Sequence, residues 1–247
     1  MSDIFQVGHL ERVPLGTPYP GIVAHVGRLL GKLPNPELVI DYTGVGRPVF
    51  DLFTYAGISP VGVLITGGAD ETRHGVICSV PKLTLVSRLQ ALLHEGRLKI
   101  QKELAEAATL VRELQDFRGG FTEAGHLTFN ARAGKHDDLV LALAIAIWRA
   151  YGGGMASWGL FELTRQRAAA LGVRSAIGPR YFVGVDLGQS RDPTAIAVVR
   201  RVNLTDLAAA VEADRKPEPY YAPGSIEWQR QQERNDADKS PAKRGPG

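Results

Sequence analysis

Three short segments of the sequence carry aspartates of the kind that bind divalent metal ions. Asp186 lies in VGVDLG, Asp41 lies in LVIDYTG, and Asp137 and Asp138 adjoin in KHDDLVLALA. Mg²⁺ and Mn²⁺ prefer carboxylate oxygens, and two such ions roughly 4 Å apart need several carboxylates in one place. Near a phosphate, such ions activate water and neutralise developing charge. These residue types therefore predict a two-metal hydrolytic site, provided that the chain brings the three segments together.

Each aspartate also has a purely structural interpretation. An aspartate at a helix start, such as Asp137 or Asp138, caps free N–H groups, and an aspartate before glycine organises a turn. We interpret Asp192, before Pro193, as a turn residue, and His136 either as a helix-entry residue or as one that adjusts orientation in the site. The charged residues of the stretch 67–75 are interpreted as a solvated surface: Asp70, Glu71, Arg73 and His74.

The elements that must position these aspartates are predicted to be strands and one buried helix. The apolar run 38–40 ends at Asp41 and leads into a glycine-rich turn, which is typical of an α/β unit. Strands over 181–185 and 194–200 flank a polar turn and predict a β-hairpin. The run 139–148 is apolar on every side, so we expect a helix in the middle of the domain. Further strands are expected over 4–13, 61–66 and 126–130, and further helices over 21–32, 48–55, 81–95 and 103–117. The last of these helices is expected to bury Leu104, Ala107, Ala108, Val111 and Leu114.

The composition excludes several classes of protein. The chain has 247 residues, of which 44% are apolar and 22% charged, and its formal net charge is +3. Such a chain is neither collagen-like, nor a coiled coil, nor wholly disordered. The longest apolar run, 139–148, is shorter than the roughly 20 residues that cross a bilayer, and the first residues lack the features of a secretory signal. We therefore expect a cytoplasmic protein without a membrane partner, and we expect its single cysteine, Cys78, to be a buried thiol.

The chain is expected to form one α/β domain followed by a tail. The domain is predicted over 1–202, with residues 151–180 joining the last helix to the hairpin at 181–201. Residues 203–247 are rich in Pro, Gln and charged residues, so we expect a polar and largely disordered tail.

The aspartate motifs and the segments between them form a pattern found in a known family. The motifs are HLERVPLGTPYP, LVIDYTGVGRPVFDLF, VPKLTLVSRLQALLHEGRLKI, LVRELQDF, GKHDDLVLALAIAIW and VGVDLGQSRDPTAIAVV. Together they resemble the nuclease domain of the large terminase subunit of tailed bacteriophages. The resemblance covers roughly residues 4–150 and 181–201.

The resemblance implies a fold, an activity and a set of site residues. The fold would be RNase H-like, with a mixed sheet flanked by helices, and the activity would be metal-dependent cutting of double-stranded DNA during genome packaging. Asp186 matches the metal ligand of the first strand, Asp41 the ligand that ends a later central strand, and Asp138, with Asp137 beside it, the ligand at the last helix. The cofactor would be Mg²⁺ or Mn²⁺ in a two-metal site. The partners would be double-stranded DNA, a packaging ATPase, a small terminase subunit and a portal.

Two features depart from the family pattern. The family places the GVDLG hairpin before the HLERVPLG strand, whereas here the hairpin follows the HDD helix, as in a circular permutation. Exposed connections tolerate such cuts, so we predict that Asp186 still reaches Asp41 and Asp138. The sequence also has no GxxxxGK[ST] phosphate loop, so we expect that an ATP-driven motor is either supplied by another protein or not used.

Cations near the motifs are the candidates for contacts with DNA phosphates, because phosphate neutralisation supplies most sequence-independent affinity. They are Arg47, Lys82, Arg88, Lys135 and Arg191.

Two other functions stay open at this point. GVDLG followed by a hairpin also resembles the first phosphate-binding turn of actin-like ATPases and sugar kinases, although those folds need two such domains. A non-catalytic DNA-binding module for packaging is the other alternative.

Overall fold

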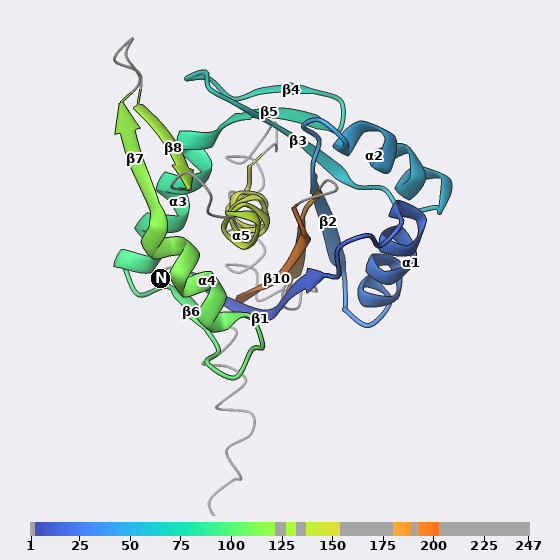
Figure 1. Cartoon of the computed structure of the whole chain (residues 1–247), viewed down its shortest axis with the longest axis horizontal. Coiled ribbons are helices and arrows are strands. Elements are labelled where there is room, and N and C mark those ends of the chain that lie inside the picture. The colour runs from blue at the N-terminus through green and yellow to red at the C-terminus, as the bar shows by residue number, and fades with distance from the viewer. Residues whose placement is uncertain (1–2, 122–126, 132–136, 154–179, 189–191, 203–247) are drawn as a thin grey trace, which may run out of the picture. The chain divides into compact units, whose positions relative to one another are not determined.

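The computed structural model describes residues 3–121, 127–131, 137–153, 180–188 and 192–202 (Figure 1). All of them belong to the first of two compact units of the chain, Met1–Asp206, and the second unit, Leu207–Gly247, lies outside the described residues. The expected tail at 203–247 and most of the expected joining segment at 151–180 also lie outside them. The predictions for these segments therefore stay predictions.

A mixed sheet of eight strands forms the centre of the first unit, in the order β4-β5-β3-β2-β9-β10-β1-β6. The pairs β5 with β3, β3 with β2, and β2 with β9 are parallel. The strand β10 is antiparallel to both β9 and β1, and β6 is parallel to β1. The α/β class with a mixed sheet flanked by helices is confirmed. The strands are β1 (Ile4–Val13), β2 (Pro36–Asp41), β3 (Val61–Thr66), β4 (Thr72–His74), β5 (Ile77–Pro81), β6 (Leu98–Ile100), β9 (Arg180–Asp186) and β10 (Thr194–Val202), and a separate antiparallel pair comprises β7 (Phe117–Phe121) and β8 (Leu127–Ala131).

Helices cover both faces of this sheet, as Figure 1 shows. They are α1 (Tyr19–Leu30), α2 (Gly46–Tyr55), α3 (Lys82–His94), α4 (Ala107–Asp116) and α5 (Asp138–Ala150). Successive strand residues point to opposite faces, so Val39 and Phe182 pack in the core that contains α3 and α5, whereas Ile40 and Val183 pack with α1 and α2. The helix α5 is buried along nearly its whole length, as its apolar sequence predicted.

The expected elements agree with the structure best where their apolar pattern is strong. The strands over 4–13 and 61–66 are confirmed at the same bounds. The expected helix over 21–32 begins two residues earlier, at Tyr19, because a proline is well accepted in the first turn of a helix.

Three expectations are wrong in ways that have physical causes. The stretch 67–75, interpreted as a loop, contains the edge strand β4, whose residues are all exposed and so show no alternation of buried and exposed positions. The strands β5 and β6 were not expected at all. In α4 the buried residues are Ala107, Leu110 and Glu113, whereas Val111 is 44% exposed. Leu110 and Val111 are consecutive and both are apolar, so the helical period alone does not decide which of them faces the core.

Cys78 is buried in the core and has no disulfide partner, as expected for a structural thiol. Burial raises the pKa of the Cys78 thiol, which disfavours the reactive thiolate. Within the described ranges, every helix is too short or too polar to traverse a lipid bilayer.

Candidate active site

Asp41 and Asp186 end two neighbouring parallel strands. Asp41 is the last residue of β2 and Asp186 the last of β9, and the preceding residues, Ile40 and Val185, are partners in the ladder. The two aspartates therefore occupy corresponding positions at the same edge of the sheet. Both side chains lie on the face that carries α5, because side chains two or four residues apart in a strand point to the same face. Asp41 comes two residues after Val39 in β2, and Asp186 comes four residues after Phe182 in β9, and both Val39 and Phe182 pack in the core with α5.

The helix α5 brings Asp138 to the same edge of the sheet. A Cβ atom at Gly184 of β9 would lie 2.0 Å from the carbonyl oxygen of Ala142 in α5, so helix and strand backbones are nearly in contact there. Asp138 lies one helical turn before Ala142, and Asp186 lies two residues beyond Gly184. Asp138 and Asp186 are both buried, at 7% and 8% exposure. Asp138 thus lies close enough to Asp186 for its charge to raise the pKa of Asp186.

The electrostatics of Asp41 and Asp186 reflect this convergence. Burial raises the pKa of Asp186 well above its usual range, and the charges of Asp41, Asp138 and Asp137 raise it further. A side-chain hydrogen bond joins Asp186 and Asp41, and Asp41 Oδ1 also accepts the backbone N–H of Thr43 at 2.8 Å. Burial raises the pKa of Asp41 too, although its bonds with Thr43 oppose that effect.

The acidic residues suit a hard divalent cation in their chemistry. Within the described part of the chain, no three His, Cys, Asp or Glu side chains are placed together as a set of metal ligands. Asp186 is buried and Asp41 is half-buried, so ionising both carboxyl groups side by side is costly, and the pKa of each is raised. Their donor atoms are all oxygen, the type that Mg²⁺ and Mn²⁺ prefer. A cation bound by these oxygens would relieve the repulsion that raises the pKa of Asp186.

Asp137 does not act as the helix cap that its position suggests. It stands at the N-cap of α5, yet its side chain makes no capping hydrogen bond. Lys82, the first residue of α3, donates instead to Asp137 Oδ2 at 3.1 Å. Asp137 is therefore held from α3, whereas Asp138 is the more buried of the adjacent pair.

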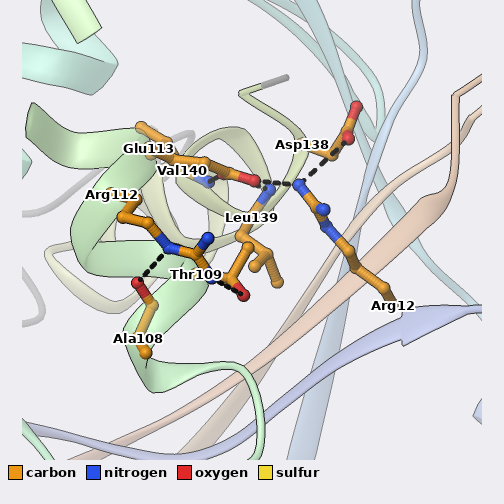
Figure 2. Close-up of polar contacts among 8 residues, drawn as sticks. All are labelled: Arg12, Ala108, Thr109, Arg112, Glu113, Asp138, Leu139 and Val140. Carbon is orange, nitrogen blue, oxygen red and sulfur yellow. Dashed lines mark hydrogen bonds and ion pairs between the residues drawn. The ribbon is translucent and has the colours of Figure 1, made fainter. Parts of the chain in front are cut away.

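Glu113 of α4 caps α5 in place of Asp137, although no role for Glu113 was expected from the sequence. Its Oε2 accepts the backbone N–H groups of Leu139 at 3.0 Å and Val140 at 3.2 Å, and its Oε1 accepts a hydrogen bond from Arg12 of β1 (Figure 2). Glu113 is only 6% exposed. One sequence signal was present: Glu113 follows Ala107 and Leu110 at intervals of three residues, so it continues a buried stripe.

We predict that Glu113 makes the stability of the protein depend on pH. Burial raises its pKa to about 7 from 4.5, against the effect of Arg12 and the two backbone N–H groups. Between these pH values the folded chain holds a proton that the unfolded chain has released, so the stability due to Glu113 falls as pH rises. As pH rises from 4.5 to about 7, the free energy of unfolding of the parent should fall by about 3 kcal/mol more than that of the Glu113→Gln variant.

Urea unfolding of both proteins at about pH 5 and about pH 8 measures this difference. An equal gap between the two proteins at both pH values would show that Glu113 titrates alike in the folded and unfolded chains.

The candidate DNA contacts occupy different surroundings. Arg47 is exposed near the start of α2, with its guanidinium 5.5 Å from the centre of the Tyr42 ring. Arg88 is paired with Glu71 at 2.9 Å. Glu71 is exposed, as its interpretation as solvated surface predicted, and it also accepts a hydrogen bond from the indole of Trp148 in α5. Lys82 contacts Asp137, as stated above, and three of the residues considered lie outside the described ranges: Lys135, His136 and Arg191.

Comparison with solved structures finds similarity to the large terminase nuclease of the thermophilic phage G20c. The structure with bound magnesium and the structure with bound cobalt each match with a TM-score of 0.42 and 22% identity, over 59% of this chain and 80% of that chain. A third structure of the same nuclease matches with a TM-score of 0.40 and 20% identity, over 58% and 81% of the two chains. No family model and no curated protein matches the sequence.

Proposed function

We propose that this chain is a metal-dependent endonuclease that hydrolyses phosphodiester bonds in double-stranded DNA, of the type that cuts phage genomes during packaging. The observation that carries the proposal is the Asp41 and Asp186 pair. These two carboxylates end adjacent parallel strands and share a hydrogen bond, and the charges of Asp137 and Asp138 act on Asp186. Folding gains nothing from gathering mutually repelling carboxylates, so the cluster is best explained by chemistry that needs it.

The side chains divide the work of the proposed site. Divalent cations, when bound, supply activation of water and neutralisation of charge on the phosphate. Asp41 and Asp186 would hold the cations from the rigid ends of two strands, and Asp138 would add a carboxylate from the start of α5. Thr43 fixes the orientation of Asp41 through its backbone N–H.

The proposed contacts with DNA depend on charge. Arg47 is exposed beside the strand end that carries Asp41, so it is placed to neutralise a phosphate close to the cleaved bond. Lys82 would meet the backbone from α3, on the side of Asp137. A packaging ATPase, a small terminase subunit and a portal are the proposed partners of a nuclease that acts on a genome in transit.

We predict that the purified chain nicks supercoiled plasmid DNA in Mn²⁺ or Mg²⁺ and stops when a chelator removes the metal. Activation of water in the proposed site depends on the cation, so its removal should leave no measurable cutting. Gel electrophoresis of the plasmid over time provides the measurement, and restoring excess Mn²⁺ after chelation is the control for protein damage.

The same assay separates the two alternative functions. A non-catalytic module would retain DNA in a gel shift but leave the plasmid intact in both metals. A kinase-like domain would bind ATP tightly in a titration and likewise leave the plasmid intact. Either result would contradict the proposed nuclease.

A further inference from the structure

Glu113 and Arg12 connect three elements at the edge of the acidic cluster. Glu113 extends from α4 to the backbone N–H groups of Leu139 and Val140 in the first turn of α5, and Arg12 reaches it from β1. Figure 2 shows the Arg12 guanidinium between Glu113 and Asp138, and its Nη2 lies 3.7 Å from Asp138 Oδ2. Neither Arg12 nor Glu113 is among the candidate metal ligands or DNA contacts of the sequence.

The contact from Glu113 fixes the start of α5. The first N–H groups of a helix have no partners within the helix, and the side chain of the N-cap residue, Asp137, does not cap them. A carboxylate is the favoured partner there because it also complements the positive end of the helix dipole. Since Asp138 is the first residue of α5, whatever fixes this turn also fixes the backbone from which the Asp138 side chain extends.

Arg12 is aligned with the metal-site candidates across the sheet. Arg12 pairs with Ala195 of β10, and Ala195 pairs with Asp186 of β9. Residues directly opposite in an antiparallel ladder share a face, so Arg12 lies on the same face as Ala195, which packs in the core with α5. The Arg12 side chain is 23% exposed, and its guanidinium is therefore a fixed positive charge at the border of the cluster. A planar guanidinium can contact two carboxylates at once, which an ammonium group does less well.

From these contacts we infer that Arg12 and Glu113 are positioning residues for Asp138, and that they thereby set the affinity of the cluster for divalent cations. The inference rests on the proposed function, because it assigns to Asp138 a role in holding a cation. Neither residue needs to touch the cation. Outer partners of this kind typically change metal affinity by about 10-fold to 100-fold when they are altered.

Mn²⁺ binding in the absence of DNA provides the test, with free Mn²⁺ measured by electron paramagnetic resonance. Glu113→Gln keeps an oxygen for the two N–H groups but replaces the ionisable carboxyl group that faces Arg12 with a neutral amide. Arg12→Lys keeps the charge but loses the forked geometry. Each should weaken Mn²⁺ binding by about 10-fold or more while the protein remains folded by circular dichroism. Arg112→Lys is the matched control, because the Arg112 contacts stay within α4, at Ala108 and Thr109 (Figure 2), and its Mn²⁺ affinity should equal that of the parent.

A double-mutant comparison distinguishes positioning from a merely structural role. In an Asp138→Ala background, Glu113→Gln should change Mn²⁺ affinity far less than in the parent, because the residue that it positions is gone. Unchanged Mn²⁺ affinity in both Glu113→Gln and Arg12→Lys would overturn the inference while leaving the proposed nuclease intact. A parent chain that binds no Mn²⁺ would overturn the proposed function and this inference together. If Glu113→Gln does not fold, Arg12→Lys alone decides between these outcomes.

Discussion

Asp186→Asn should reduce metal-dependent cutting of DNA by at least about 10³-fold without weakening the fold. This reduction in rate corresponds to a loss of about 4 kcal/mol in transition-state stabilisation. Asp186 lies at the centre of the cluster, since it bonds Asp41 and feels the charges of Asp137 and Asp138. An amide in its place offers one neutral oxygen and cannot balance the charge of a bound cation. The remaining carboxylates would then hold the cation too weakly for hydrolysis.

The stability of the same variant should move in the opposite direction. The folded pKa of Asp186 is raised well above its ordinary value of 3.8. The stability that Asp186 contributes is thus fully present below its ordinary pKa and is lost as pH rises through its folded pKa. Near neutral pH without metal, the parent must either bury the Asp186 charge beside other carboxylates or take up a proton there, and the neutral amide of the Asp186→Asn variant avoids both costs. The melting temperature of the variant should therefore equal or exceed that of the parent. Loss of activity with gain of stability marks a residue retained for chemistry.

Plasmid nicking in Mn²⁺ and thermal unfolding without metal measure the two effects. Asp51→Asn is a matched control, because Asp51 is an exposed aspartate in α2 away from the cluster. It should leave cutting unchanged. Undiminished cutting by Asp186→Asn would show that hydrolysis occurs elsewhere in the chain, and Asp41→Asn and Asp138→Asn would extend the test to the other two segments.

The position of each aspartate at the end of a strand or the start of a helix was predictable because it depends on local patterns that the sequence shows clearly. Apolar runs that end at Asp41 and Asp186 indicate strands, and a run that is apolar on all sides indicates a central helix after Asp138. Each pattern locates its aspartate at an element end. The order of the strands required the resemblance to a family, because local periodicity does not reveal which strands pair. The placement of the hairpin β9 and β10 between β2 and β1 is such a long-range pairing. Whether it arose by circular permutation stays a prediction.

The contacts of Glu113 could not be predicted in the same way. Its partners are backbone N–H groups 26 and 27 residues further along the chain, and backbone groups have no sequence signature. Capping is usually sought within the residues that precede a helix, where the sequence offers Asp137. A cap that comes from another helix depends on how α4 packs beside α5, and that packing differs by one residue from the expected face of α4.

Gly184→Ala should lower the free energy of unfolding by about 3 kcal/mol or more. The added Cβ would lie 2.0 Å from the carbonyl oxygen of Ala142 and 2.9 Å from the Cβ of Ala146. The first of these is a backbone atom, so no side-chain rotation relieves the overlap. The helix α5 would have to move away from β9, and Asp138 would move with it, away from Asp186. We therefore expect DNA cutting to fall together with stability.

Urea unfolding and plasmid nicking of the same preparation test both parts of this prediction. Gly8→Ala is a suitable control, because Gly8 lies in a strand of the same sheet and an added Cβ there has nothing within 4 Å. Its stability should stay within about 0.5 kcal/mol of the parent. A Gly184→Ala protein as stable as Gly8→Ala would mean that α5 does not approach β9 this closely. The approach of Asp138 to Asp186, on which the proposed site depends, would then lose its structural basis.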